Sequence, residues 1–522
     1  MRSILISVSI SILILATVAA AVLQPGVDAA RAQALQHLFV TTTEGQVYGP
    51  VQGGVAAFKG IPYAAPPIGD LRWRPPQPAA SRSEIFLASD YGPPCLQPPT
   101  PDIPELETAS EDCLTINIFR PFEVENPLPV MVWFHGGSFA DGAGGDPLTD
   151  GSRLAAEGVI VVTFNYRLGP LGWLADPPRS HETADLDANL GMLDQIAALR
   201  WVAENIGVFG GDAGNVTLFG DTAGATSVAM LMVSEAAAGL FQKAIIQSGR
   251  LREPARSLAE AQATDHAFFR ILFRIPGVGD HSSRLREVSS EQLLAAETTL
   301  LDDRLAGFSP ILDGNLVKES LAMAFKAGHE RHIPLIIGTN EDETLRVPEA
   351  ARRSNIDLNI DLALANETMD LLKQLYPEAG SDRRKLAASL FTDRTFVEPA
   401  RFIARAHALR DAPTYRYSFS YRPPGSPRGE ATSGPEVEFV FGTLGAGTTG
   451  LFTYKDRETS NVMRAYWENF ARTGDPNGPG LPVWPRYSSD EQILTISNGG
   501  IFAHRDPWTA RLDRLEQQSE SR

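Results

Sequence analysis

The chain has 522 residues, of which 43% are hydrophobic and 21% charged, an ordinary globular composition. A formal net charge of −17 without any run of Lys or Arg argues against nucleic acid as a partner, because phosphate binding needs clustered cations. The two cysteines, Cys95 and Cys113, are too few for a disulfide-dense scaffold or for a zinc site made of cysteines alone.

The first residues have the pattern of a secretory signal peptide. Arg2 precedes an apolar segment that continues to Val27, and small residues recur up to Ala34. The alternative is an uncleaved membrane anchor, since about 20 apolar residues can span a bilayer. Gln24, Pro25 and Gly26 dilute the apolar segment and favour cleavage. We therefore predict a signal peptide over residues 1–34 and a secreted or periplasmic protein, which contacts a membrane only if this segment is retained.

The following residues predict a small antiparallel hairpin and then a parallel sheet. Residues 38–78 are rich in Gly and Pro, which is typical of a hairpin and irregular loops. Short apolar runs further along indicate strands buried on both faces, with helical patterns between them. The expected strands are 130–134, 159–164, 216–219, 243–247 and 334–338, and the clearest helix covers about 189–205. This alternation predicts an α/β fold with helices on both faces of the sheet.

Two later segments, 250–330 and 348–410, are helical and polar. We interpret them as insertions into one domain that covers residues 35–515, not as separate domains. Residues 422–435 form a loop by composition, because Pro, Gly and Ser dominate them.

A strand-turn-helix motif follows the strand predicted at 216–219. Its sequence is Gly220-Asp221-Thr222-Ala223-Gly224. A Gly-x-Ser-x-Gly turn in this setting is the nucleophile elbow of α/β-hydrolases, in which small residues allow the chain to turn sharply. The nucleophile position is occupied here by threonine.

A second motif, His135-Gly136-Gly137, ends the strand predicted at 130–134. Two glycines there expose backbone N–H groups that can bind an oxyanion together with the N–H of the residue after the nucleophile. The alternative is an ordinary turn. An elbow-like turn downstream favours the oxyanion hole.

With these motifs the chain resembles the type-B carboxylesterase family, the cholinesterase-like group of α/β-hydrolases. Further segments that carry the resemblance are Phe58 to Ala64, Ser110 to Leu114, Phe209 to Asp212, Gln247 to Gly249 and Phe470 to Gly474. The resemblance implies an α/β-hydrolase fold with a mostly parallel central sheet, flanking helices and helical insertions. It also places Cys113 in the first disulfide of the family. Export by itself favours a Cys95–Cys113 bridge over the alternative of two buried thiols.

The resemblance implies a Ser-His-Glu triad that hydrolyses carboxylic esters. Carried over position by position, the nucleophile falls on Thr222, the acid on Glu343, the base on Ser433, and the oxyanion hole on Gly136, Gly137 and Ala223. None of the nine histidines lies in the loop that should supply the base. Both the nucleophile and the base are therefore substituted.

These substitutions lead to three hypotheses. In the first, ester hydrolysis is lost or greatly weakened, because a serine hydroxyl cannot act as a base near neutral pH, while the pocket still binds a small ester-like or apolar ligand. In the second, the chain is an active hydrolase in which Thr222 attacks and a water, Glu436 or Glu438 accepts the proton. In the third, the pocket performs non-hydrolytic chemistry such as proton transfer or cyclisation.

Other features have structural interpretations. Ser227 is read as a buried structural serine, Trp73 and Trp133 as core residues, and the acidic, glycine-rich segment 141–146 as a surface loop in preference to a metal site. The sequence predicts no cofactor and no metal. It leaves the ligand and the oligomeric state open.

Overall fold

The computed structural model describes residues 38–98, 108–175, 188–252, 255–274, 282–302, 307–346, 368–424, 435–446 and 452–520. The predicted signal peptide and Ser433 lie outside these residues. Within them, no helix combines the length and the apolar character that a membrane span requires.

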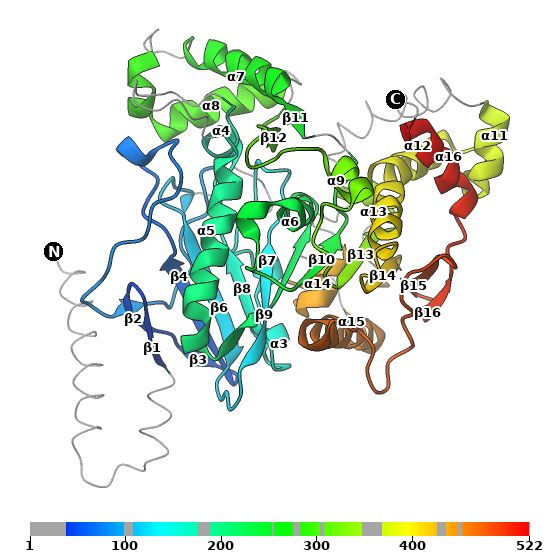
Figure 1. Ribbon diagram of the computed structural model, residues 1–522, viewed down its shortest axis with the longest axis horizontal. Helices are drawn as coiled ribbons and strands as arrows, with labels where there is room; N and C mark the ends of the chain where they lie inside the picture. Colours follow the sequence, from blue (N-terminus) through cyan, green and yellow to red (C-terminus); the bar gives the residue numbers. More distant parts are fainter. Residues whose placement is uncertain are drawn as a thin grey trace.

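A twisted sheet forms the centre of the described structure (Figure 1). In spatial order its eleven described strands are β16 (Gly500–Arg505), β15 (Gln492–Ser497), β14 (Thr414–Phe419), β13 (Leu335–Asn340), β10 (Lys243–Gln247), β9 (Gly211–Asp221), β7 (Leu128–Phe134), β8 (Ile160–Phe164), β6 (Thr115–Pro121), β4 (Val55–Pro62) and β3 (Val51–Gln52). The strands from β15 to β8 in this order pair in parallel. The outer strands pair antiparallel. The expected mostly parallel α/β sheet is therefore confirmed.

The strand order reverses direction at β7. β8 follows β7 in the chain and lies on one side of it, whereas β9 lies on the other side. In open α/β sheets, ligands bind at the carboxyl ends of the strands where the order reverses. β7 ends immediately before His135, and β9 ends immediately before Thr222. The topology alone thus brings the two predicted motifs to one place.

Helices cover both faces of the sheet, because alternate residues of each buried strand point to opposite faces. Val130 and Val132 of β7 belong to one hydrophobic core, with α5 (Leu190–Asn205), α6 (Ala223–Val233) and α13 (Glu398–Ala408). Met131 and Trp133 belong to the other, with α14 (Pro435–Phe441) and α15 (Tyr454–Thr473). The short helix α3 (Ser152–Ala155) lies on this second face.

The predicted N-terminal hairpin is confirmed by β1 (Phe39–Thr42) and β2 (Gly45–Tyr48), with β5 (Phe86–Leu87) beside β2. The irregular loops expected after it are wrong in part, because β4 is an eight-residue strand of the main sheet. A bulge between Phe58 and Ile61 interrupts its pairing with β6, and Gly60 has φ +69° there. This bulge disturbs the alternating pattern by which strands are recognised in a sequence.

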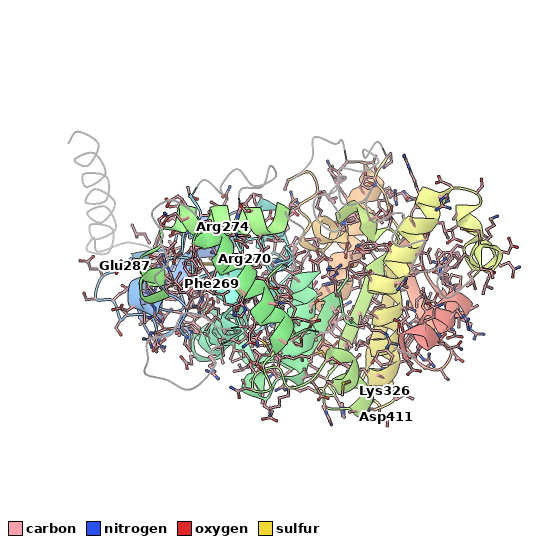
Figure 2. The ribbon with its side chains drawn as sticks, turned by 90° about the horizontal axis from the view of Figure 1, so that it is seen from above. Phe269, Arg270, Arg274, Glu287, Lys326 and Asp411 are labelled. Atoms are coloured by element: carbon pink, nitrogen blue, oxygen red, sulfur yellow. A yellow bond between two sulfur atoms is a disulfide. The ribbon has the colours of Figure 1, made fainter. Side chains whose placement is uncertain are left out.

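The described parts of the two polar segments are mostly helical, as predicted. The first supplies α7 (Leu258–Leu272), α8 (Ser290–Asp302), α9 (Leu321–Ala327) and the short pair β11 (Arg256–Ser257) and β12 (Ile311–Leu312). α7 and α8 lie over α4 (Gly169–Gly172) at one end of α5 (Figure 1). From above, the labelled Phe269 and Arg270 of α7, and Arg274 just after it, lie far from Lys326 of α9 (Figure 2). We call α7 and α8 the cap.

The second insertion supplies α11 (Met369–Leu375), α12 (Arg383–Thr392), the π-helix η9 (Asp393–Val397) and α13. They pack near the last helix, α16 (Thr509–Glu520) (Figure 1).

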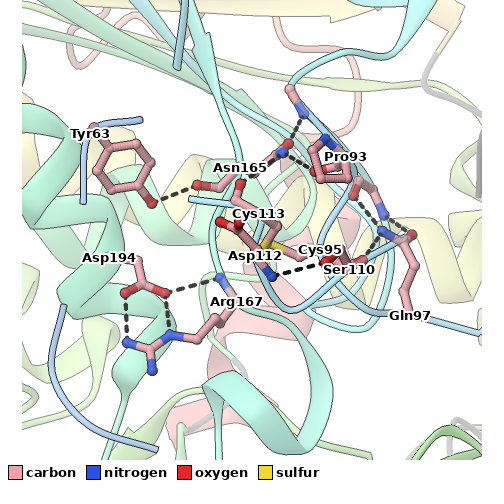
Figure 3. Close-up of a disulfide and its surroundings, with 12 residues drawn as sticks. Tyr63, Pro93, Cys95, Gln97, Ser110, Asp112, Cys113, Asn165, Arg167 and Asp194 are labelled. Atoms are coloured by element: carbon pink, nitrogen blue, oxygen red, sulfur yellow. Dashed lines mark hydrogen bonds and ion pairs between the residues drawn. A yellow bond between two sulfur atoms is a disulfide. The ribbon is translucent and has the colours of Figure 1, made fainter. Parts of the chain in front are cut away.

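One disulfide joins Cys95 to Cys113 (Figure 3), so the expected bridge is present. Hydrogen bonds hold the chain around it: the side-chain amide of Asn165 donates to the carbonyl O atoms of Pro93 and Cys113 at 2.9 and 3.1 Å. Glu111, two residues before Cys113, accepts two hydrogen bonds from Arg72 at 2.5 and 2.7 Å. Arg72 also donates to the carbonyl O of Val288 at 2.7 Å, so it ties the disulfide loop to the segment that leads into α8.

We expect removal of this bridge to destabilise the fold by about 2–4 kcal/mol, because the bridge limits the freedom of the unfolded chain. The measurement is the urea midpoint of the oxidised protein, of the reduced protein and of Cys95→Ala/Cys113→Ala. Reduction and the double substitution should lower the midpoint by similar amounts. Equal midpoints for all three samples would contradict the prediction.

Candidate active site

The first part of the site is the turn between β9 and α6. Thr222 occupies it with φ 50° and ψ −109°, and its N–H donates to the carbonyl O of Gln247 at 3.0 Å. A Cβ on Gly224 would lie 1.9 Å from the carbonyl O of Phe134, and one on Gly220 would lie 2.6 Å from the carbonyl C of Gly224. The motif thus has the strand, sharp turn and helix of an elbow, and its two glycines are needed for close backbone approach.

Thr222 is strained in this turn, because a β-branched residue with positive φ is a steric outlier. Such conformations cost on the order of 1–3 kcal/mol. Its Oγ1 lies 2.4 Å from the point that a Cβ on Gly136 would occupy. Among the described residues, this hydroxyl makes no hydrogen bond. The predicted nucleophile faces the backbone of Gly136 and no described base.

The second part of the site is the loop over residues 135–142, which follows β7 and which we call the oxyanion loop. Gly137 has φ +98°, and a Cβ on it would lie 2.0 Å from the carbonyl O of Asp141. The N–H groups of Ala140 and Asp141 both donate to the carbonyl O of Gly137 at 2.9 Å. The loop therefore curls tightly and holds Gly136 against Thr222, which directly precedes Ala223 at the start of α6.

His135 of this loop is buried, and no hydrogen bond among the described residues joins its ring to Thr222. Its Nδ1 lies 2.9 Å from the carbonyl O of Gly136, and its ring stacks on Tyr166 at a centroid distance of 4.2 Å. Burial lowers the pKa of His135 to about 4, although its contact with the Gly136 carbonyl acts in the opposite direction. The imidazole is neutral at pH 7 and supports the loop.

Glu343, the predicted acid, begins the 3₁₀ turn η7 (Glu343–Arg346) just after β13 and is fully buried. Its Oε1 accepts from Ser248 Oγ at 2.6 Å and from the backbone N–H of Asn340 at 2.8 Å. Its own N–H donates to Thr392 Oγ1 at 3.1 Å. Ser248 and Asn340 therefore hold the carboxylate, and Thr392 separately holds the backbone of Glu343.

Ser248 connects Glu343 to a second buried carboxylate. Ser248 follows β10 with φ 57°, and its hydroxyl also lies 3.3 Å from Oε1 of Glu436 in α14. A hydroxyl has a single proton, so the shorter contact with Glu343 is the stronger bond. Ser433, the predicted base position, lies three residues before Glu436 and outside the described residues. The geometry of that position therefore stays a prediction.

Sequence reasoning did not assign Ser248, Asn340 or Thr392 to the site. Ser248 and Asn340 stand at the carboxyl ends of β10 and β13, where polar residues of a parallel sheet gather, so the strand prediction could have found them. Thr392 belongs to an insertion and carries no local signal. Ser227 is buried and accepts from the Gln195 side chain at 2.9 Å, which confirms its structural interpretation.

Two carboxyl groups that sequence reasoning did not assign to the site are Asp141, within the oxyanion loop, and Glu297, beside it. Asp141 Oδ1 lies 2.2 Å from the point that a Cβ on Gly137 would occupy, and Glu297 Oε1 of α8 lies 2.2 Å from the corresponding point on Gly169. The N–H of Gly169 donates to the carbonyl O of Phe139, within the loop, at 2.9 Å. The cap therefore contributes an acidic group next to this loop.

Burial sets the protonation of both groups. It raises the pKa of Asp141 to about 6, and burial together with the charge of Asp141 raises the pKa of Glu297 to about 8. Near pH 7 the pair thus holds one carboxylate and one carboxylic acid. The surface-loop prediction for 141–146 is wrong, because Ala143 and Gly144 are buried and the N–H of Gly144 donates to Asn165 Oδ1 at 2.7 Å.

Among the described residues, no group of three or more His, Cys, Asp or Glu side chains has the arrangement of a metal site. The described site therefore offers a strained hydroxyl, backbone donors and buried carboxyl groups. It can bind a polarised carbonyl oxygen, and it can hold or move protons on carboxylates.

Comparison with known proteins gives this site its context. A family model described as "Carboxylesterase family" matches residues 36–506. The para-nitrobenzyl esterase of Bacillus subtilis (strain 168) is 38% identical over 504 residues, covering 92% of this chain and 99% of that protein. The fumonisin B1 esterase of Sphingopyxis macrogoltabida is 35% identical, covering 88% and 86%. The carboxylesterase structure from Geobacillus stearothermophilus has a TM-score of 0.80 at 33% identity, covering 92% of this chain and 99% of that one.

The neutral imidazole of His135 predicts a pH dependence of stability. The folded pKa is about 4, below the unfolded value near 6.5, so the unfolded chain takes up a proton first as the pH falls. The stability that the neutral form contributes is present above pH 6.5 and is lost between about pH 6.5 and 4.

We expect the free energy of unfolding of His135→Asn, which keeps a donor near the position of Nδ1, to fall less than that of the parent between pH 7 and 4.5. The difference should be about 2–3 kcal/mol. Urea unfolding at the two pH values measures the difference. The matched control is His266→Asn, on the exposed side of α7. If both variants follow the parent curve, His135 does not carry this pH dependence.

Proposed function

Because the chain belongs to the carboxylesterase family, we propose that it is a homologue whose ester hydrolysis is lost or greatly weakened, while its oxyanion hole and pocket still bind a small ester-like or apolar ligand. The main support for this proposal is the placement of Thr222, whose hydroxyl lies against Gly136 and makes no hydrogen bond to any described residue.

The proposal rests first on the missing base. In a Ser-His-Glu triad, the imidazole removes the hydroxyl proton and later returns it to the leaving group. The position that the family resemblance assigns to this imidazole is Ser433. Loss of one triad member costs roughly 10⁴ to 10⁶ in rate, and the oxyanion hole alone retains about 10³ to 10⁴ over water.

Glu343 and Glu436 are poor substitutes for the base. Glu343 Oε1 already accepts from Ser248 and Asn340, and Glu436 Oε1 lies within reach of the same Ser248 hydroxyl. Glu438, the other carboxylate in this helix, accepts from the backbone N–H of Gly445 at 3.4 Å. These contacts favour structural roles for all three and count against an active hydrolase built on Thr222.

The strain at Thr222 supports the same proposal. Threonine places an additional methyl group on a backbone conformation that serine would occupy more easily. Exchange for serine removes the methyl group without changing the hydroxyl. Threonine at position 222 and serine at position 433 would together remove the proton relay and leave the backbone of the site in place.

We expect Thr222→Ser/Ser433→His to hydrolyse p-nitrophenyl acetate at least about 10³-fold faster than the parent, because both parts of the relay return together. Each single substitution should gain far less. The matched control, Thr222→Ser/Thr432→His, places the imidazole one residue away and should stay near the parent rate. Labelling of the parent by a fluorophosphonate, if abolished by Thr222→Ala, would contradict the proposal.

A second candidate function, proton transfer without hydrolysis, is favoured by the carboxyl pair at the oxyanion loop. An ionised carboxylate and backbone donors for a carbonyl oxygen are the groups that enolisation requires. Asp141 would take a proton from the carbon next to the bound carbonyl and return it to that carbon, and the enolate oxygen would accept from the loop N–H groups. No redox partner is needed.

For this second function we expect exchange of the α-protons of methyl phenylacetate in D₂O, followed by proton NMR. Activity should rise as Asp141 ionises near pH 6 and fall as Glu297 ionises near pH 8. Asp141→Asn should abolish the exchange. Asp146→Asn, which preserves the cap on the Leu148 N–H, is the control. Exchange no faster than in buffer would exclude this function.

A further inference from the structure

A long helical segment runs from α12 through η9 into α13. In η9 the chain makes a wider turn, and the N–H of Glu398 donates to the carbonyl O of Asp393, five residues earlier. π-helical turns are rare and frequently accompany functional sites. Thr392, Asp393 and Glu398, at the two ends of this turn, contact Glu343, Arg511 and Arg252.

Toward the candidate site, the turn holds two chain segments. Thr392, the last residue of α12, accepts from the N–H of Glu343 at 3.1 Å. Glu398, the first residue of α13, accepts from Nε and Nη2 of Arg252 at 2.6 to 2.9 Å. Arg252 lies four residues after Ser248, whose hydroxyl donates to Glu343. Each partner in the Ser248–Glu343 bond therefore has its segment fixed by one end of the π turn.

Away from the site, the same turn is held by the C-terminal helix α16. Nε of Arg511 lies 2.7 Å from Oδ2 of Asp393, the first residue of η9. The Arg511 guanidinium also lies over the rings of Trp508 at 3.9 Å and Tyr376 at 4.7 Å, and it donates to Glu378 at 2.5 Å. Asp393 and Arg511 are both buried, so removal of the Arg511 charge takes this ionic partner from Asp393, whereas removal of the Asp393 charge leaves Arg511 paired with Glu378.

We propose that Thr392 and the Asp393–Arg511 ion pair are positioning groups for Glu343, and that the C-terminal helix thereby controls the geometry of the acid position. The inference rests on the proposed function only for the role of Glu343. The contacts themselves do not depend on it.

The ion pair is the sensitive part of this connection. Thr392 and Asp393 are adjacent, so a displacement of Asp393 moves the hydroxyl that receives the Glu343 N–H. The η7 turn begins at Glu343, so this N–H has no partner from a preceding helical turn, and Thr392 supplies it from another element. Loosening at α16 should therefore reach Glu343 before it reaches the central strands.

The test is hydrogen exchange of the Glu343 amide in the full chain, followed by mass spectrometry or NMR. We expect Arg511→Met, which keeps an apolar stem between the two rings, and Thr392→Val, which keeps the shape but removes the hydroxyl, to speed this exchange about tenfold. Thr392→Ser should restore the parent rate. The matched control is Arg405→Met, which removes an exposed pair with Glu516 of the same helix α16 but leaves Asp393 untouched.

Exchange at β9 and β10 shows whether each variant remains folded, and Asp393→Asn is the second variant should Arg511→Met not fold. Unchanged exchange at Glu343 in folded Arg511→Met and Asp393→Asn would overturn the proposal. So would an equal acceleration in Arg405→Met, because the effect would then be general loosening.

A kinetic test uses the background Thr222→Ser/Ser433→His. There, Arg511→Met should lower kcat about five- to tenfold with KM unchanged, since Glu343 would act on the chemical step. A rise in KM alone would contradict a positioning role. An inactive background would count against the proposed function, and the exchange measurement would still decide the present proposal.

Discussion

The whole site depends on the contact between two backbones that have no side chain between them. Gly224 brings the start of α6 so close to the end of β7 that a single methyl group there would lie 1.9 Å from the carbonyl O of Phe134. Parallel pairing of β7 with β9 aligns Phe134 with Gly220 and fixes this approach. As a result, Gly136 meets the Thr222 hydroxyl directly. The positive φ of Thr222 is the cost of that arrangement, and it is borne by a residue type that tolerates it poorly.

Around this contact, the described site contains carboxyl groups where a proton relay would need an imidazole. Glu343 and Glu436 converge on the Ser248 hydroxyl, and Asp141 and Glu297 lie within and beside the oxyanion loop. The buried imidazole of the loop stays neutral because burial lowers its pKa to about 4. In the proposed function such a site would accept a carbonyl oxygen at its backbone donors, but the described residues give the Thr222 hydroxyl no base. These side chains accordingly favour the proposed binding function over ester hydrolysis.

The sequence pattern predicts the strands and helices whose burial gives a periodic signal within a few residues. The apolar runs of β7, β8, β10 and β13 and the stripe of α5 are visible in sequence because burial imposes the pattern directly. β4 was missed because a bulge at Gly60 breaks its alternation. Thr392 and Glu297 were missed because they come from insertions, whose packing against the strand ends is a matter of tertiary contact. Asp141 is likewise predicted on the surface, but its carboxyl group is largely buried and its charge acts on Glu297 of the cap. Ser433, outside the described residues, still rests on the family resemblance.

The contacts that join the disulfide loop to the cap, through Arg72 and Glu111, also affect how the chain folds. Ser290, at the start of α8, donates to Glu111 at 2.8 Å, a contact that joins residues 179 positions apart. Contacts of such large sequence separation are slow to form, because the chain between them must lose its freedom before the contact returns any energy. The disulfide confines Glu111 within a short covalent loop in advance. By limiting the local freedom of Glu111, the bridge should lower the entropic barrier for docking α8, and an oxidising compartment would speed the assembly of the cap.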